Sequence, residues 1–141
     1  MEPAWDFYFC EIDEAPASIF LDMAPLKSAP DSSRPWLICL RVMMQNPRED
    51  GLSSGEEFDA LAKFDELLAM ALGDHCDARA VGRLTWNGTR EFFYYAAEDE
   101  GLLEVVEGVF SGTGYEAMYR TEHDPDWSHY YQFIAPDRMC Y

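Results

Sequence analysis

The residues best suited to metal chemistry lie close together near the end of the sequence. His123, Asp124 and Asp126 are nearly consecutive, and His129 follows six positions after His123. Imidazole and carboxylate ligands suit zinc or iron. The same residues also fit the start of a helix, with Asp124 as the N-cap and Asp126 complementing the helix dipole. We favour the helix start, so the sequence predicts no metal and no cofactor.

Patterns of catalytic residues are weak elsewhere in the chain. His75 and Cys76 are neighbours, but adjacent side chains rarely point the same way and no third group completes a nucleophilic site. Carboxylate pairs are too frequent for their adjacency to indicate a hydrolase. The sequence contains no G-x-S-x-G, P-loop, G-x-G-x-x-G, H-E-x-x-H or EF-hand pattern. It therefore favours a protein that is not an enzyme.

Arginine and aromatic residues share one face of a predicted hairpin over residues 79–96. Asn87-Gly88 between two β-prone runs is typical of a two-residue turn. Alternation around that turn places four residues of interest on one face, namely Arg83, Arg90, Phe92 and Tyr94. A neighbouring strand is expected to bring Arg41 to the same region.

This face has two interpretations. Arginines among exposed rings can bind a carboxylate, a phosphate or a stacked base, which would make the chain a ligand-binding or enzymatic domain. Alternatively, Arg83 and Arg90 pair with carboxylates such as Glu91 or Asp6. Because 27 acidic residues face 10 basic ones, we favour this pairing.

The chain is strongly acidic, and its charge is unevenly distributed. The 141 residues carry a formal net charge of −17, with −7 in residues 48–77 and −8 in residues 98–126, whereas residues 78–97 carry +2. Hydrophobic residues make up 48% of the chain, which is enough to bury a core. The net charge would repel phosphates, which argues against nucleic-acid binding.

The acidic segments predict a contact with a basic protein. Complementary charge speeds the association of proteins, and a basic surface is what these segments would attract. We expect the contact to involve Glu98, Asp99, Glu100, Glu104 and Glu107, followed by Glu56, Glu57, Asp59, Asp65 and Glu66. The alternative is a solvated surface that only keeps the protein soluble.

Hydrophobic patterning predicts the strands that position these residues. Strands are expected over residues 5–12, 18–23, 36–44, 79–86, 89–96 and 116–121. A turn around Glu14-Ala15-Pro16 separates the first two. The run at 36–44 is almost continuously apolar, which is typical of a strand covered on both faces.

Three helices are expected from capping signals and apolar spacing. The first begins with a capping box, either Ser53 with Glu56 or Ser54 with Glu57, and ends at Gly73. The second spans residues 101–110, with Glu98–Glu100 capping its N-terminus. The third begins at Asp124 and presents an apolar stripe of Trp127, Tyr130, Tyr131 and Ile134.

The order of elements indicates an α+β fold. From residue 36 it is strand, helix, strand, strand, helix, strand, which predicts a ferredoxin-like split β-α-β core over about residues 36–121. Two extra N-terminal strands and a short C-terminal helix complete a single domain of residues 1–141. Right-handed crossovers would place both main helices on one face of the sheet. An exposed edge strand can pair two copies, so we expect a monomer or a homodimer.

The sequence predicts a cytoplasmic protein. Its first residues lack the basic and apolar regions of a signal peptide, and no apolar run approaches the ~20 residues that span a membrane. The four scattered cysteines are expected to be reduced, namely Cys10, Cys39, Cys76 and Cys140.

Several short motifs occur in an order that resembles a bacterial family. They are the opening strand at Trp5, the loop Asp50-Gly51-Leu52, the hairpin from Gly82 through Asn87-Gly88-Thr89-Arg90-Glu91-Phe92, and Asp124-Pro125-Asp126-Trp127 with Tyr130 and Pro136. They span nearly the whole chain and resemble domain-of-unknown-function family 695. That family is similar to the regulator of ribonuclease activity B group, ferredoxin-like proteins with an acidic surface. The prototype of that group binds and inhibits a ribonuclease.

The resemblance implies a compact ferredoxin-like domain with a protein-binding role, and it implies no site residue. Together with the charge distribution, it favours a non-catalytic regulator or adaptor that docks a basic protein. An immunity protein against a basic nuclease toxin would have the same acidic surface, so it stays an alternative.

Overall fold

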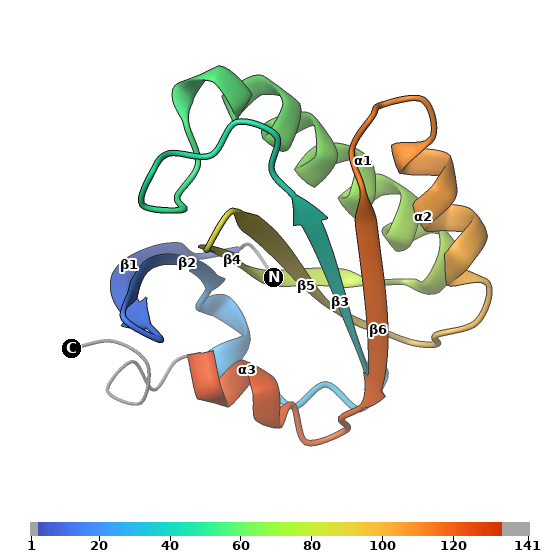
Figure 1. Ribbon diagram of the computed structural model, residues 1–141. Coiled ribbons are helices and arrows are strands. Elements are labelled where there is room, and N and C mark those ends of the chain that lie inside the picture. The colour runs from blue at the N-terminus through green and yellow to red at the C-terminus, as the bar shows by residue number, and fades with distance from the viewer. Residues whose placement is uncertain (1–2, 134–141) are drawn as a thin grey trace.

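The computed structural model describes residues 3–133, which form an α+β protein built on one antiparallel sheet (Figure 1). The strands lie in the order β1-β2-β4-β5-β3-β6. Their bounds are β1 Trp5–Ile12, β2 Ala15–Asp22, β3 Trp36–Met43, β4 Arg79–Trp86, β5 Thr89–Ala96 and β6 Ala117–His123. The helices are α1 Phe58–Cys76, α2 Leu102–Phe110 and α3 Ser128–Phe133, with short 3₁₀ turns at Ala24–Lys27 and Gly55–Glu57.

Helices α1 and α2 cover one face of the sheet, as predicted (Figure 1). Residues of α1 at a spacing of three to four turn inward, including Leu61, Leu68 and Leu72. They pack on alternate residues of β3, whose Ile38, Leu40 and Val42 are fully buried. We call this aliphatic cluster the helix-side core.

The opposite face of the sheet carries a second core, which α3 and the turn before it close (Figure 1). Trp127 stacks on Tyr95 with ring centroids 4.1 Å apart, and Tyr130 meets Trp127 edge to face. The predicted stripe on α3 therefore forms at Trp127, Tyr130 and Tyr131, while Ile134 lies outside the described residues. We call this cluster the aromatic core.

The two N-terminal strands extend the main sheet beyond β4. The predicted turn around Glu14-Ala15-Pro16 is wrong by about two residues. Asp13 and Glu14 both have positive φ and form the turn, so β2 already begins at Ala15. Pro16 is tolerated in the strand because pairing with β4 begins only at Ala17.

Strand β1 forms one edge of the sheet and exposes an aromatic stripe. Trp5, Phe7 and Phe9 alternate along one face of the strand, and all three are exposed. The Asp6 carboxylate accepts a hydrogen bond of 2.9 Å from the Phe7 backbone N–H. One donor of this edge is therefore occupied by a side chain.

The predicted capping box before α1 does not form. Neither Ser54 nor Glu57 makes a side-chain capping bond, and the 3₁₀ turn leads into α1 at Phe58. The Ser54 hydroxyl instead donates to the Asn46 carbonyl at 2.6 Å. Predicted capping of α2 by Glu98–Glu100 is also wrong, because Gly101 in a left-handed conformation precedes α2 without a side-chain cap.

Two further helix boundaries differ from prediction. Helix α1 continues through Gly73 to Cys76, and Asp77 takes the left-handed position with its N–H bonded to the Gly73 carbonyl at 3.1 Å. Helix α3 begins at Ser128 rather than near Asp124, because Trp127 has positive φ and interrupts the turn.

The loop before α1 packs against the hairpin turn. The Gly88 N–H donates to the Gly51 carbonyl at 2.9 Å. Gly51 has positive φ, and a Cβ there would lie 2.8 Å from Asn87 Cα, so only glycine fits. This contact brings together the Asp50-Gly51-Leu52 and Asn87-Gly88 motifs, which are far apart in sequence.

Candidate functional site

The helix layer and the segments that lead into it carry many exposed carboxylates. Exposed carboxylates occur along α1 and α2 and before each helix, at Glu56, Asp59, Glu66, Asp74, Glu98, Glu100, Glu104 and Glu107. None of these eight makes an ion pair within residues 3–133. Their charges are therefore available to a partner rather than neutralised internally.

The predicted acidic residues form two groups rather than one patch. His75 near the C-terminus of α1 bonds to the Glu100 carbonyl at 2.6 Å, so Glu98, Glu100 and Glu104 lie at that end. Glu56 and Asp59 lie at the other end of α1, about 27 Å away along a helix of 19 residues. Asp99 is half-buried and accepts a hydrogen bond from the Thr121 hydroxyl at 3.1 Å.

Two residues predicted to contact a basic partner instead bind groups within the protein. Glu57 is only 2% exposed, and its carboxylate accepts hydrogen bonds from the backbone of Gln45 and Asn46 and from the Tyr115 hydroxyl. Burial opposes its ionisation, but these hydrogen bonds outweigh it and lower the pKa of Glu57 below the ordinary 4.5. Asp65 is half-buried and pairs with Arg83 at 2.7 Å.

The predicted arginine and aromatic face does not form an open surface. Phe92 and Tyr94 do share a face with Arg83 and Arg90, but both rings are 1% exposed because α1 and α2 cover them. Arg41 lies on the opposite face, where it pairs with Glu91 at 2.8 Å. The expectation that Arg41 joins the others is therefore wrong.

The two remaining arginines of that face have different partners. Arg83 combines its Asp65 ion pair with a position 4.4 Å over the Phe20 ring. Arg90 bonds to the hydroxyls of Thr85 and Ser53 rather than to a carboxylate. Burial, helped by the charge of Arg83, lowers the pKa of Arg90 to about 10.

A small hollow of about 120 Å³ remains beside α1. It is lined by Trp5, Phe20, Asp65, Ala80, Gly82, Arg83, Phe92 and Tyr94. The buried Tyr94 hydroxyl has no hydrogen-bond partner within the described residues. Three of the five residues predicted for ligand binding thus meet at one hollow.

The opposite face of the sheet has a shallow depression of about 230 Å³ that sequence reasoning missed. It is lined by Cys39, Arg41, Glu91, Met118, Tyr119 and Arg120. Cys39 is buried there, and burial with the nearby Glu91 charge raises the pKa of its thiol to about 12. The thiol is therefore not activated as a nucleophile.

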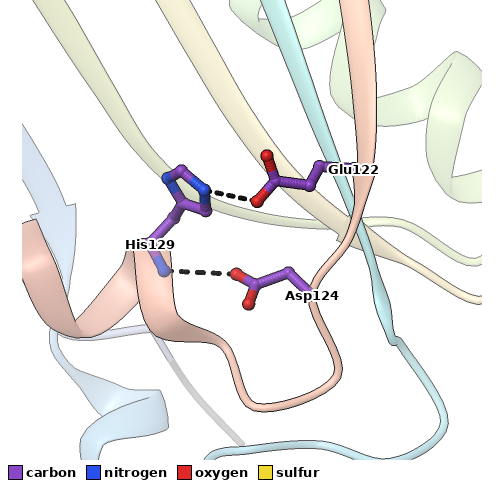
Figure 2. A group of neighbouring side chains, drawn as sticks. All are labelled: Glu122, Asp124 and His129. Atoms are coloured by element: carbon purple, nitrogen blue, oxygen red, sulfur yellow. Dashed lines mark hydrogen bonds and ion pairs between the residues drawn. The ribbon is translucent and has the colours of Figure 1, made fainter.

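The C-terminal cluster is organised as a helix cap (Figure 2). Ligand atoms of Glu122, Asp124 and His129 lie within 4.8 Å of one another. However, Asp124 already accepts four hydrogen bonds, from the Tyr95 hydroxyl, the Ser128 backbone and hydroxyl, and the His129 backbone. A metal ion would have to displace some of them.

The electrostatics of Asp124 agree with that structural role. Burial opposes its ionisation, but the hydrogen bonds from Tyr95, Ser128 and His129 together hold the pKa of Asp124 below the ordinary 3.8. His129 Nε2 pairs with Glu122 at 2.5 Å. The sequence identified Asp124 and His129 but missed Glu122, and His123 instead packs on Trp36 with ring centroids 4.8 Å apart.

The cysteines show no reactive arrangement. Cys10, Cys39 and Cys76 are free and buried, and Cys140 lies outside the described residues. Burial raises the pKa of Cys76 to about 11, with nearby Glu98 adding to the effect. His75 bonds to a backbone carbonyl rather than to this thiol.

Comparison with known proteins identifies the family. Residues 3–135 match the family of unknown function DUF695, so the chain belongs to that family, as its motifs predicted. No curated protein and no solved structure matches the chain. Among the described residues, no helix combines the length and apolar character needed to cross a membrane.

Proposed function

We propose that this DUF695 member is a non-catalytic regulator or adaptor that docks a basic protein on its helix layer. The observation that carries the proposal is the set of exposed carboxylates on and around α1 and α2 that lack an internal ion pair. Complementary charge would raise the association rate and fix the orientation of the partner. The docking residues are Glu98, Glu100, Glu104 and Glu107, followed by Glu56, Asp59 and Glu66.

The fold supports this role by presenting the acidic helices on a rigid base. We infer that β3, α1, β4, β5, α2 and β6 form a ferredoxin-like split β-α-β core. The strand order β4-β5-β3-β6, with antiparallel pairing throughout, supports that inference. The helices then project from one face, where a partner can reach both.

The proposal also covers the location of the protein, its oligomeric state and its partners. We propose a cytoplasmic protein, monomeric or homodimeric, that does not bind nucleic acid, because its net charge of −17 repels phosphates. A basic nuclease toxin would be attracted by the same carboxylates. The immunity-protein alternative therefore differs in the identity of the partner and not in the docking residues.

The test is a pull-down from native lysate with three matched baits. They are the wild type, a helix-layer variant (Glu100→Lys, Glu104→Lys, Glu107→Lys) and a control variant (Glu11→Lys, Glu49→Lys, Asp126→Lys). Both variants change the net charge equally, and all six residues are exposed. The proposal predicts a basic protein that the wild type and control enrich and the helix-layer variant loses. A partner lost equally from both variants, or from neither, would contradict it.

Ligand binding at the hollow beside α1 is a second candidate, supported by the unpartnered Tyr94 hydroxyl. A ligand with a planar ring and a carboxylate would suit this hollow. Its ring would stack on Trp5, and its carboxylate would accept hydrogen bonds from Arg83 and the Tyr94 hydroxyl. Benzoate has both features and serves as the probe. The candidate predicts shifts of the Trp5 and Gly82 amide signals on benzoate titration, and that Arg83→Ala removes them.

A further inference from the structure

The outer surface of the helix layer is hollowed between α1 and α2. The groove has a volume of about 480 Å³ and is lined by Leu67, Met70, Ala71 and Asp74 of α1 and by Glu104, Val105, Gly108 and Val109 of α2. Six of these eight residues are apolar or glycine. The groove therefore differs from the charged surface around it.

The apolar side chains that line the groove are exposed or half-buried, unlike those of the core. Met70 points outward with 61% of its surface exposed. Val105 and Val109 are only half-buried, whereas Val106 and Phe110 on the inner side of α2 are buried. A Cβ at Gly108 would meet nothing within 4 Å, so this glycine leaves the middle of the groove open.

The rims of the groove are acidic on both sides. Asp74 stands on the α1 side and Glu104 on the α2 side. Glu66 lies four residues before Met70, on the same side of α1. All three carboxylates are exposed and make no ion pair within residues 3–133. A chain lying in the groove would meet an apolar floor, with Glu66 and Asp74 on one side and Glu104 on the other.

We propose that this groove binds an amphipathic helix of a protein partner, with an apolar stripe flanked by lysine or arginine. The inference rests on the proposed function and specifies the form of the partner. Apolar residues at positions i, i+3 or i+4, and i+7 contact Met70, Val105 and Val109. Basic residues on both sides of that stripe reach Glu66, Asp74 and Glu104.

The dimensions of α2 set the length of the bound helix. Its nine residues span about 13 Å, which corresponds to two to three helical turns in the partner. A second copy of this chain does not fit the groove, because its own helix layer would bring like charges together. Charge complementarity therefore selects a basic partner over self-association.

Two synthetic peptides of identical composition test the proposal. Both contain only leucine, lysine and alanine, but one places leucine at i, i+3, i+4 and i+7 and the other scrambles the order. Binding is measured by fluorescence anisotropy of labelled peptide. The groove predicts that the patterned peptide binds at least about tenfold more tightly than the scrambled one. Equal affinity would overturn the groove, because charge alone would then explain binding.

Substitutions at Gly108 provide the matched variants. Gly108→Trp fills the groove without changing charge, and Gly108→Ala makes the same change of backbone entropy while leaving the groove open. Circular dichroism confirms that each variant is folded. We expect Gly108→Trp to weaken binding of the patterned peptide at least about tenfold, and Gly108→Ala to leave it unchanged.

The charge variant separates the two proposals. If the helix-layer variant loses the patterned peptide but Gly108→Trp binds it as the wild type does, acidic docking stands and the groove is wrong. If the helix-layer variant and the wild type bind it equally, the acidic rim does not contribute to binding and the groove is wrong, whereas the proposed function is decided by the pull-down.

Discussion

The two faces of the sheet are stabilised by different chemistry. The helix-side core is made largely of aliphatic contacts, such as those of Ile38 and Leu68. The aromatic core combines stacked rings with the buried Asp124 carboxylate, which accepts a hydrogen bond from Tyr95 and caps α3. A core of the first kind tolerates changes that preserve volume, whereas one of the second kind depends on single hydrogen-bonding groups.

A second buried acidic residue, Asp22, lies beside the aromatic core and is bonded to it through its backbone carbonyl. Asp22 is buried, accepts hydrogen bonds from the backbone of Ala4 and Ala24, and pairs with Arg79 at 3.1 Å. The Tyr130 hydroxyl donates to the Asp22 carbonyl at 2.8 Å. The N-terminal strands and α3 are therefore joined through polar groups, which explains how a six-residue helix holds its position.

The largest expected effect comes from removing the Asp124 carboxylate. Asp124→Ala leaves the Tyr95 hydroxyl and the first N–H groups of α3 without their acceptor, and we expect a loss of about 4 kcal/mol in the free energy of unfolding. Leu68→Ala in the helix-side core should cost about 3 kcal/mol. Urea denaturation measures both.

Conservative substitutions test whether the two cores differ in their tolerance of change. Leu68→Met preserves volume and should cost less than about 1.5 kcal/mol. Asp124→Asn preserves shape but replaces one acceptor oxygen with an NH₂ group, and we expect it to cost more than Leu68→Met. If Asp124→Asn proved the milder change, the distinction between the two cores would fail.

A pH titration of stability is expected to show the next largest effect, because one buried carboxylate lies beside each core. Asp124 and Glu57 have folded-state pKa values below their ordinary 3.8 and 4.5. Their stabilisation is therefore complete above these ordinary values and is lost as the pH falls through the folded-state pKa values. We expect the free energy of unfolding to decline below about pH 4.5, and the decline to be shallower in Asp124→Asn.

Leu68→Ala is the matched control for that titration. It lowers stability at every pH but removes no titrating group, so its decline below pH 4.5 should run parallel to that of the wild type. A parallel decline in Asp124→Asn would show that this carboxyl does not contribute to the pH dependence.

The smallest stability effect is expected at the acidic surface outside both cores. The helix-layer variant changes exposed residues without internal ion pairs, so its free energy of unfolding should stay within about 0.5 kcal/mol per substitution of the wild type. Thermal unfolding checks this. A large loss would mean that these carboxylates serve the fold, and would remove the basis for their proposed role in docking.

The helix-side core was the part of the fold most accessible to sequence reasoning. Strand β3 and the hairpin register around Asn87-Gly88 follow from local periodicity and turn chemistry. The face of Arg41 was predicted wrongly because it depends on how β3 pairs with β5. A shift of one residue in such a register moves a side chain to the other face.

The polar contacts were harder to predict from the sequence, because their partners are distant in the chain. The Ser54 and Glu57 spacing is the same whether the glutamate caps its own helix or turns inward to Gln45, Asn46 and Tyr115. Gly73 resembled a helix stop, but the left-handed position belongs to Asp77. Glu122 carried no local signal, because its contact with His129 requires the turn between β6 and α3.

The unlike edges of the sheet affect how the protein behaves at high concentration. One edge is β1 with its aromatic stripe, and the other is β6, so joining β1 of one copy to β6 of the next would leave the same two edges free. Where the rotation between successive copies does not close a ring, such growth produces fibres rather than a defined oligomer. The Asp6 bond to the Phe7 N–H and the charge of −17 both resist this polymerisation. Salt screens the net charge, but it does not remove the Asp6 side chain from the Phe7 N–H on the β1 edge. High salt therefore weakens only one of the two features that oppose polymerisation.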